Sequence, residues 1–342
     1  MTIPHVSVVV PAYNAASTIG ACVAALQEQS FDLPYEIIVV NDGSTDRTAA
    51  VAEAAGATVL TTPNGRPAAA RNAGIHAARG SIVCCTDADC VPHPDWLREI
   101  TAPFANPEVV ASKGTYATRQ QELVARFVQL EYEDKYDRMR PGEAIDFVDT
   151  YSAAYRRDVL LAHDGFDERF DYLEDQELSF RLAAHGYKMV FQPTAIVDHL
   201  HSATLGDYLR KKRTIGYWKA LVVSRYPDRA IRDSHTPQIM KVQMLLSLLL
   251  VVSTLLGTAG LIIGPGRWEL SAALFLVPAA TVGLLFLATT LPFIGKAWPK
   301  DRAVAIVSPV LLLGRALALG VGYALGALRP IRRRSGQTTN IA

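Results

Sequence analysis

The sequence has little net charge and few cysteines. Its 342 residues carry a formal net charge of +1, and charged side chains make up 20% of the chain. Proteins that bind the nucleic-acid backbone usually have a basic excess, so the composition argues against nucleic acid as a partner. Three of the four cysteines cluster between residues 84 and 90 without zinc-ligand spacing, and nothing indicates a disulfide framework. A reducing compartment is the simplest expectation.

The first ten residues also lack the basic segment of a secretory signal, and their apolar run stops at Pro11. We therefore expect the N-terminal domain to stay in the cytosol.

Residues 6–197 alternate short β-branched runs with Ala-rich stretches of helical periodicity, which is typical of an α/β domain with a largely parallel sheet. We expect strands at Val6–Val10, Glu36–Val40, Thr58–Thr61, Ser81–Cys85 and Val109–Gly114, and a strand pair across Lys188–Val197. We expect helices at Ser17–Gln29, Thr45–Ala55, Ala68–Ala78, Asp95–Thr101, Gln120–Arg138 and Glu174–His185.

Beyond Pro237 the sequence becomes strongly apolar. Val242–Gly264 and Leu270–Gly295 contain no ionised side chain, and each is long enough to cross about 30 Å of hydrocarbon at about 1.5 Å per residue. We predict that both are transmembrane helices. A third stretch, Ala303–Leu328, is interrupted by Gly314 and Arg315. It either crosses the membrane or forms a broken, re-entrant or interfacial segment.

Polar residues follow the first two predicted strands. Pro11, Ala12, Tyr13 and Asn14 end the first, and Asp42-Gly43-Ser44-Thr45-Asp46 follows the second. Ligands of open parallel sheets bind outside the carboxyl ends of the strands, so both segments should face one crevice. Asp42 is suited to accept a hydrogen bond from a base N–H, and Tyr13 to stack on the base. The alternative for residues 42–46 is a turn followed by a helix cap.

Asp87-Ala88-Asp89 follows the fourth predicted strand. Two carboxylates one residue apart at a strand end are able to bind a hard divalent cation, whose open positions take the oxygens of a diphosphate. An Asp-x-Asp sequence in a loop is more often ordinary turn chemistry. Its position directly after an apolar strand favours the metal.

In their order along the chain, these motifs resemble those of the family 2 glycosyltransferases with the GT-A fold. The segments that carry the resemblance are residues 8–14, 41–46, Ala69-Ala70-Arg71-Asn72 and 87–89. The resemblance covers roughly residues 6–213. It implies donor contacts from Pro11, Ala12, Tyr13, Asn14, Asp42, Arg71 and Asp87, and a Mg²⁺ or Mn²⁺ ion held by Asp89.

The same resemblance extends to Asp164-Gly165-Phe166-Asp167-Glu168 and to the segment that begins with Leu173-Glu174-Asp175. It implies that Asp175 is the general base that takes the proton of the acceptor hydroxyl during inversion. The alternative is that Glu174 and Asp175 only favour the N-terminus of a helix through its dipole. Among the later residues, His199 matches the position of a metal-binding His better than His201 does, and an ordinary surface role is the alternative for both.

Residues 205–219 interleave basic and aromatic side chains, as at a membrane interface. Glu174, Arg213 and Trp218 are candidates for the acceptor or diphosphate side of the site. The alternative for the basic run is a solvated surface of the catalytic domain.

We therefore predict an α/β GT-A domain (1–204), a basic and aromatic linker (205–237), a membrane module with two or three transmembrane segments (238–330) and a polar tail (331–342). The predicted protein is an inner-membrane glycosyltransferase with a cytoplasmic catalytic domain. Its partners would be a nucleotide-sugar donor, a lipid-linked or glycan acceptor, and membrane lipids. The basic loop 296–302 and the tail, with Arg329, Arg332, Arg333 and Arg334, slightly favour a cytosolic C-terminus by the positive-inside rule.

Two other functions compete with this prediction. A sugar-1-phosphate nucleotidyltransferase normally uses a Gly-rich N-terminal loop with a basic residue, and Pro11-Ala12-Tyr13-Asn14 does not provide one. A non-catalytic scaffold of glycan assembly would retain the motifs without activity.

Overall fold

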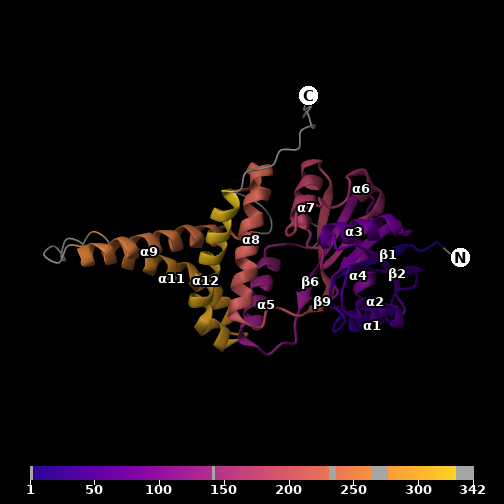
Figure 1. Cartoon of the computed structure of the whole chain (residues 1–342), viewed down its shortest axis with the longest axis horizontal. Helices are drawn as coiled ribbons and strands as arrows, with labels where there is room; N and C mark the ends of the chain where they lie inside the picture. The colour runs from indigo at the N-terminus through magenta and orange to yellow at the C-terminus, as the bar shows by residue number, and fades with distance from the viewer. Residues whose placement is uncertain (1–2, 141–142, 231–235, 264–273, 275, 329–342) are drawn as a thin grey trace, which may run out of the picture.

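The structure is a computed structural model that describes residues 3–140, 143–230, 236–263, 274 and 276–328 (Figure 1). The predicted basic tail, and part of the predicted second span, lie outside these residues. Within them, the chain folds into an α/β domain followed by long C-terminal helices.

The α/β domain is built on one mixed sheet with the strand order β3-β2-β1-β4-β8-β6-β9-β5, and β7 pairs with β9. Its strands β1, β2, β3 and β4 are mutually parallel, as predicted, whereas β8 runs antiparallel to both β4 and β6. The strands are β1 Val6–Ala12, β2 Tyr35–Asp42, β3 Thr58–Thr62, β4 Ile82–Thr86, β5 Cys90–Pro92, β6 Val109–Ala117, β7 Ala144–Ile145, β8 Ser152–Arg156 and β9 Lys188–His199.

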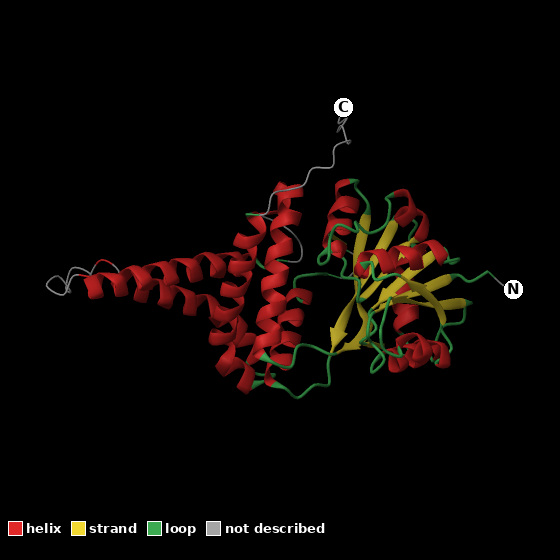
Figure 2. Cartoon of the chain, viewed as in Figure 1, coloured by secondary structure: helices red, strands yellow, loops and turns green. Residues whose placement is uncertain are grey.

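Helices cover both faces of this sheet (Figure 2). Val8 and Val10 of β1 pack in one core cluster with α1 and α4, and Val9 packs in a second cluster with α3 and α7. Burial on both faces explains the nearly continuous apolar sequence of the strand. The helices of the domain are α1 Ile19–Gln27, α2 Thr48–Ala54, α3 Arg66–Ala77, α4 Trp96–Thr101, α5 Leu123–Tyr136, α6 Arg157–Ala162 and α7 Glu174–Ala184.

Two sequence predictions differ from the structure. The predicted strand pair across Lys188–Val197 is wrong, because the single strand β9 runs through it beside β6. The register of that pairing shifts between Phe191 and Ile196, and the bulge contains Pro193, which has no N–H to donate to a sheet. The second helix begins at Thr48 and not at Thr45, because Ser44 and Thr45 form hydrogen bonds to the loop after β1 instead.

The remaining helices are α8 Leu205–Arg225, α9 Gln238–Ile263, α11 Val277–Ala297 and α12 Arg302–Ala327. By length and composition, the last three are able to cross a membrane, with α9 qualifying over Gln238–Ala259. Figure 1 shows α9 and α11 projecting together from the rest of the molecule, whereas α8 and α12 lie side by side across the base of that projection. The α12 helix is continuous from Arg302 to Ala327, so the predicted alternative of a broken, re-entrant segment does not occur.

Glycines bring α8 and α12 into backbone contact. A Cβ atom added at Gly322 would lie 2.0 Å from the carbonyl oxygen of Arg213, and one at Gly326 would lie 2.2 Å from that of Tyr217. On α8, a Cβ at Gly216 would lie 2.3 Å from the carbonyl oxygen of Leu319. Only glycine permits this approach, so these residues fix how the two helices pack.

The connection between α11 and α12 lies against the α/β domain. Lys300 pairs with Glu133 of α5 at 2.5 Å, and Asp301 pairs with Arg126 of the same helix at 2.8 Å. The other end of α12 packs on α8 at Gly326. Both ends of α12 therefore remain on the side of the α/β domain.

Candidate active site

A cavity of about 1150 Å³ lies between the carboxyl ends of the parallel strands and the helices α5, α7, α8, α9 and α12. Eleven of the thirteen predicted site residues line it: Pro11, Ala12, Tyr13, Asn14, Asp42, Arg71, Asp87, Asp89, Glu174, Asp175 and His199. Arg213 and Trp218 are not among the lining residues. Arg213 is exposed, and Trp218 is buried against Phe170 with a ring separation of 5.8 Å.

The loop after β1 is held by Asn14, whose φ of 48° is a left-handed conformation that Asn tolerates. The side-chain amide oxygen of Asn14 accepts a hydrogen bond from the backbone N–H of Thr45 at 2.9 Å. The backbone N–H of Asn14 donates to the Ser44 hydroxyl, also at 2.9 Å. The adjacent Tyr13 is 52% exposed. This loop therefore presents a free aromatic ring at the edge of the cavity.

Asp42 is only 5% exposed and is extensively bonded within the protein. Its carboxylate accepts hydrogen bonds from the N–H groups of Gly65 at 2.8 Å and Arg66 at 2.9 Å, and from the Thr62 hydroxyl at 3.1 Å. These contacts tie the end of β2 to the start of α3. They differ from the turn and cap of the following helix that the alternative expects, in which Asp46 takes part by accepting from the Thr48 N–H at 2.9 Å.

Arg71 connects the two acidic parts of the site. This buried guanidinium donates to Asp87 at 2.8 Å and to Glu174 at 2.5 Å. Because Asp87 follows β4 and Glu174 begins α7, one side chain fixes the strand end relative to the helix start. Its two terminal nitrogens are both engaged by carboxylates in this arrangement.

Asp89 and His199 meet at the cavity wall. The Asp89 Oδ2 and His199 Nε2 atoms are 3.5 Å apart, and possible ligand atoms of Asp89, Cys90 and His199 lie within 4.8 Å of one another. Burial and the neighbouring Asp87 raise the pKa of Asp89 to about 6, while burial lowers the pKa of His199 to about 4. Burial also keeps the Cys90 thiol protonated by raising its pKa. A carboxylate with a like-charged neighbour and a neutral imidazole are suitable ligands for Mg²⁺ or Mn²⁺.

Asp175 lies in the first turn of α7, within the cavity wall. Burial, together with the charges of Glu174 and Asp149, raises the pKa of its carboxyl well above the usual range. A carboxylate with a raised pKa holds a proton more strongly, which suits a general base. The helix start is also acidic, as the dipole alternative expects, but the burial of Glu174 and Glu177 goes beyond what that alternative requires.

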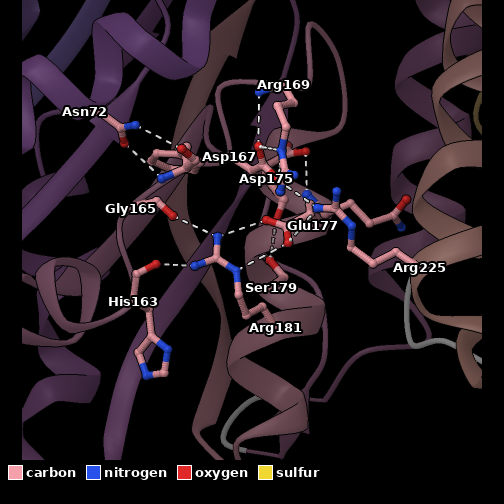
Figure 3. Close-up of polar contacts among 12 residues, drawn as sticks. Asn72, His163, Gly165, Asp167, Arg169, Asp175, Glu177, Ser179, Arg181 and Arg225 are labelled. Atoms are coloured by element: carbon pink, nitrogen blue, oxygen red, sulfur yellow. Dashed lines mark hydrogen bonds and ion pairs between the residues drawn. The ribbon is translucent and has the colours of Figure 1, made fainter. Parts of the chain in front are cut away.

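A network of polar contacts holds α7 in place (Figure 3). Arg181 of α7 donates to the carbonyl oxygens of His163 and Gly165 and pairs with Glu177 at 2.9 Å. Arg225 of α8 reaches Asp167 at 2.7 Å and Glu177 at 3.4 Å. These contacts join the loop before α7, α7 itself and the end of α8.

Asn72 anchors the same loop from α3. Its amide oxygen accepts from the Phe166 N–H at 2.8 Å, and its amide nitrogen donates to the Phe166 carbonyl at 2.9 Å (Figure 3). A Cβ atom added at Gly165, where φ is 59°, would lie 2.4 Å from Asn72. Arg71 and Asn72 of α3 therefore hold together the end of β4, the loop before α7 and the start of α7.

Several residues that sequence reasoning did not select also line the cavity. They are chiefly basic residues of α8 and α12 and buried acids: Glu131, Asp149, Lys211, Lys212, Lys219 and Arg315. Arg315 carried a signal, because a cation inside an apolar segment is usually functional or paired. Lys211, Lys212 and Lys219 belong to the basic run at residues 205–219, but the sequence did not show which of its cations reach the cavity. Glu131 and Asp149 carried no such signal, because only the tertiary packing brings them to this cavity.

The fold and the site define a GT-A-like transferase domain with C-terminal helices. A mannosyltransferase of Pyrobaculum calidifontis, solved in complex with GDP-Man and Mn²⁺, has the same fold with a TM-score of 0.58. It is 22% identical, and the match covers 95% of this chain and 88% of that one.

Residues 7–163 match the model of the family described as glycosyl transferase family 2, which assigns this region of the α/β domain to that family. The pre-mycofactocin glycosyltransferase of Mycobacterium tuberculosis is 29% identical over 66% of this chain, and glycosyltransferase AglE of Haloferax volcanii is 26% identical over 63%. The matched region spans 48% of the mycobacterial protein and 73% of the archaeal one. The predicted family and fold are thereby confirmed.

Proposed function

We propose that this protein transfers a sugar, with inversion, from a nucleotide-sugar to a lipid-linked acceptor or nascent glycan at the cytoplasmic face of the inner membrane. One observation carries the proposal: a single cavity contains the acidic strand end, Asp175 and a wall from α8 and the long apolar C-terminal helices. The donor would lie against Pro11, Ala12, Tyr13, Asn14, Asp42, Arg71 and Asp87. A donor and an amphipathic acceptor could then meet at one point.

The proposed chemistry uses the chain's own carboxylates. The Asp175 carboxylate takes the proton of the acceptor hydroxyl, whose oxygen forms a bond to the anomeric carbon. The bond from that carbon to the diphosphate oxygen breaks, and its electron pair leaves with the nucleoside diphosphate. A Mg²⁺ or Mn²⁺ ion held by Asp89 and His199 would supply charge neutralisation for that leaving group.

The wall farthest from the sheet supports an amphipathic acceptor. It combines the cations of Lys211, Lys212 and Lys219 with apolar side chains that include Met240, Met244, Phe293, Leu319 and Tyr323. Cations beside an apolar lining suit an acceptor with an anionic head and a hydrocarbon tail. Glu174 and Lys219, which donates to Gln176 at 3.1 Å, would border the acceptor.

The arrangement of the C-terminal helices supports the membrane location. On α9 and α11, Leu245, Leu255, Leu284 and Leu291 are all more than half exposed, as expected for a hairpin that faces lipid. We propose that this hairpin crosses the membrane and that α12 lies at its surface beside α8. The exposed residues Ile306, Val310, Val321 and Leu325 recur at helical spacing and would face the lipid.

Incubation of the purified protein with a panel of nucleotide-sugars and Mn²⁺, with and without a polyisoprenyl phosphate, tests the function. We expect release of nucleoside diphosphate that increases with the lipid, and a glycolipid product by mass spectrometry. A parallel incubation with nucleoside triphosphates and sugar 1-phosphates tests the alternative enzyme, because release of pyrophosphate there would support a nucleotidyltransferase. No turnover in either incubation would support a scaffold. Either result would overturn the proposal.

A further inference from the structure

A chain of hydrogen bonds runs from α5 to the back of His199. The Gln129 Oε1 atom lies 3.0 Å from His201 Nε2, and His201 Nδ1 lies 3.0 Å from His199 Nδ1. His199 ends β9, His201 follows two residues later, and both imidazoles are buried. His201 lies behind the cavity wall rather than in it, because His199 lines the cavity and His201 does not.

The amide of Gln129 determines the direction of this chain. Its nitrogen donates to the Tyr116 carbonyl at 3.0 Å and to Glu133 at 3.3 Å, so its oxygen faces His201. An amide oxygen only accepts, and therefore His201 Nε2 carries the hydrogen. The contact between the two Nδ1 atoms needs one bare nitrogen, and a His201 imidazole whose single hydrogen is on Nε2 supplies it.

The tautomer of His199 follows from that of His201. With its hydrogen on Nε2, His201 has a bare Nδ1 that accepts, so the hydrogen in the next bond belongs to His199 Nδ1. The lone pair of His199 is then on Nε2. That atom faces Asp89 Oδ2 at 3.5 Å, so two acceptors lie opposite each other when Asp89 is ionised. Such a pair is suited to a cation.

We propose that Gln129 and His201 are positioning residues that hold His199 in the tautomer that presents Nε2 to a divalent cation shared with Asp89. The proposal rests on the metal site of the proposed function. Residues that orient a metal-binding His in this way typically change metal affinity by about 10–100-fold when they are removed.

Other contacts restrict the movement of the His201 ring. The side-chain oxygen of Gln120 accepts from the backbone N–H of His201 at 2.5 Å, and its side-chain nitrogen donates to the backbone carbonyl of His201 at 3.1 Å. The ring stacks on Tyr132 with a centroid separation of 5.7 Å and an interplanar angle of 10°. These contacts hold the backbone of His201 and the plane of its ring in place.

Titration of the full-length, metal-free protein with Mn²⁺, followed by electron paramagnetic resonance of the free ion, tests the proposal. His201→Phe keeps the ring and its stacking but removes the acceptor. His201→Asn has an amide oxygen that can take the place of Nδ1. We expect a dissociation constant about 10–100-fold higher for His201→Phe and a value near that of the wild type for His201→Asn. His163→Phe, which changes a histidine outside the cavity, controls for loss of an imidazole.

Nitrogen-15 NMR of the wild-type imidazoles gives a second measurement that does not depend on a variant folding. We expect His199 to be protonated at Nδ1 and bare at Nε2 in the absence of metal. Three results would each overturn the proposed role of Gln129 and His201. They are the opposite tautomer of His199, equal Mn²⁺ affinity of His201→Phe and the wild type, and an equal loss of affinity in His201→Phe and His201→Asn. If the wild type does not bind Mn²⁺, the metal site itself is overturned, and with it the positioning role of Gln129 and His201.

Discussion

Arg315 of α12 donates a hydrogen bond of 2.7 Å to Glu131 of α5, which lies 184 residues earlier in the chain. Lys212 and Tyr208 of α8 reach the other carboxylate oxygen at 3.1 and 3.0 Å. Arg315 also donates to Gln243 of α9 at 2.5 Å. One buried carboxylate thus joins the catalytic domain to α8 and α12 directly, and to α9 through Arg315. Burial alone would raise the pKa of Glu131, but Lys212 and Arg315 outweigh it and lower the pKa to about 2.

We expect Glu131→Gln to destabilise the protein more than Arg315→Met does. The first change leaves Arg315 and Lys212 buried without an anion, at a cost of about 3–5 kcal/mol, whereas the second leaves the Glu131–Lys212 pair intact. The double variant should recover part of the loss, because it removes one of the two unpaired cations. Thermal unfolding in detergent measures all three. Equal effects of the two single changes, with strict additivity, would show that the residues do not interact.

Asp175→Asn should retain donor binding and lose transfer. The amide keeps the shape of the carboxylate but is unable to take a proton, so turnover should fall by about 10²–10⁴-fold. Because the pKa of Asp175 is raised, wild-type turnover should also increase with pH through a range above that of an ordinary carboxyl. Calorimetry with the nucleoside diphosphate measures binding. Asp158→Asn changes an exposed acid of α6 and serves as the control. A parallel loss of donor affinity would assign Asp175 to the donor pocket.

Metal binding should stabilise the protein more at pH 7.5 than at pH 5. The pKa of Asp89 is about 6 in the folded protein and 3.8 for a free side chain, so the metal-free native state binds this proton more tightly than the unfolded state does. The stability that the protonated Asp89 carboxyl contributes is complete below about pH 4 and is lost as the pH rises through about 6. Mn²⁺ competes with the proton and is favoured at the higher pH. We therefore expect a larger Mn²⁺-induced rise in melting temperature at pH 7.5.

Asp89→Asn provides the control for this pH dependence. The amide neither titrates nor binds the metal as a carboxylate does, so most of the Mn²⁺ effect should disappear at both pH values. An undiminished rise in melting temperature in Asp89→Asn would place the metal elsewhere.

Cysteines introduced at Lys300 and Leu328 should lie on the same side of the membrane as the catalytic domain. Both ends of α12 contact that domain or α8, and the native cysteines are buried and should give little background. We expect no labelling of either variant by an impermeant thiol reagent in intact cells, and labelling of both after permeabilisation. Labelling of Leu328→Cys alone in intact cells would mean that α12 crosses the membrane.

Many of the residues predicted to contact the donor could be identified from the sequence, because they directly follow predicted strands. Asp87 and Asp89 follow an apolar strand, and Asp42 follows another, so the topology of a parallel sheet brings them to one edge. The α7 start was predictable for a similar reason, since Glu174 and Asp175 precede a clear helical pattern. Periodicity did not reveal β8, because its residues Ser152–Arg156 carry no alternating pattern.

The sequence by itself determined the α/β domain, the acidic strand ends and the apolar C-terminal segments, because these depend on the order and spacing of neighbouring residues. Only the tertiary structure decided that Arg315 meets Glu131, that Gln129 and His201 stand behind His199, and that Lys211 rather than Arg213 faces the cavity. These relationships depend on the rotation and packing of α5, α8 and α12 about one another. A helix with apolar residues on most of its surface does not specify that rotation, which the close contacts of Gly216, Gly322 and Gly326 fix only once the helices meet.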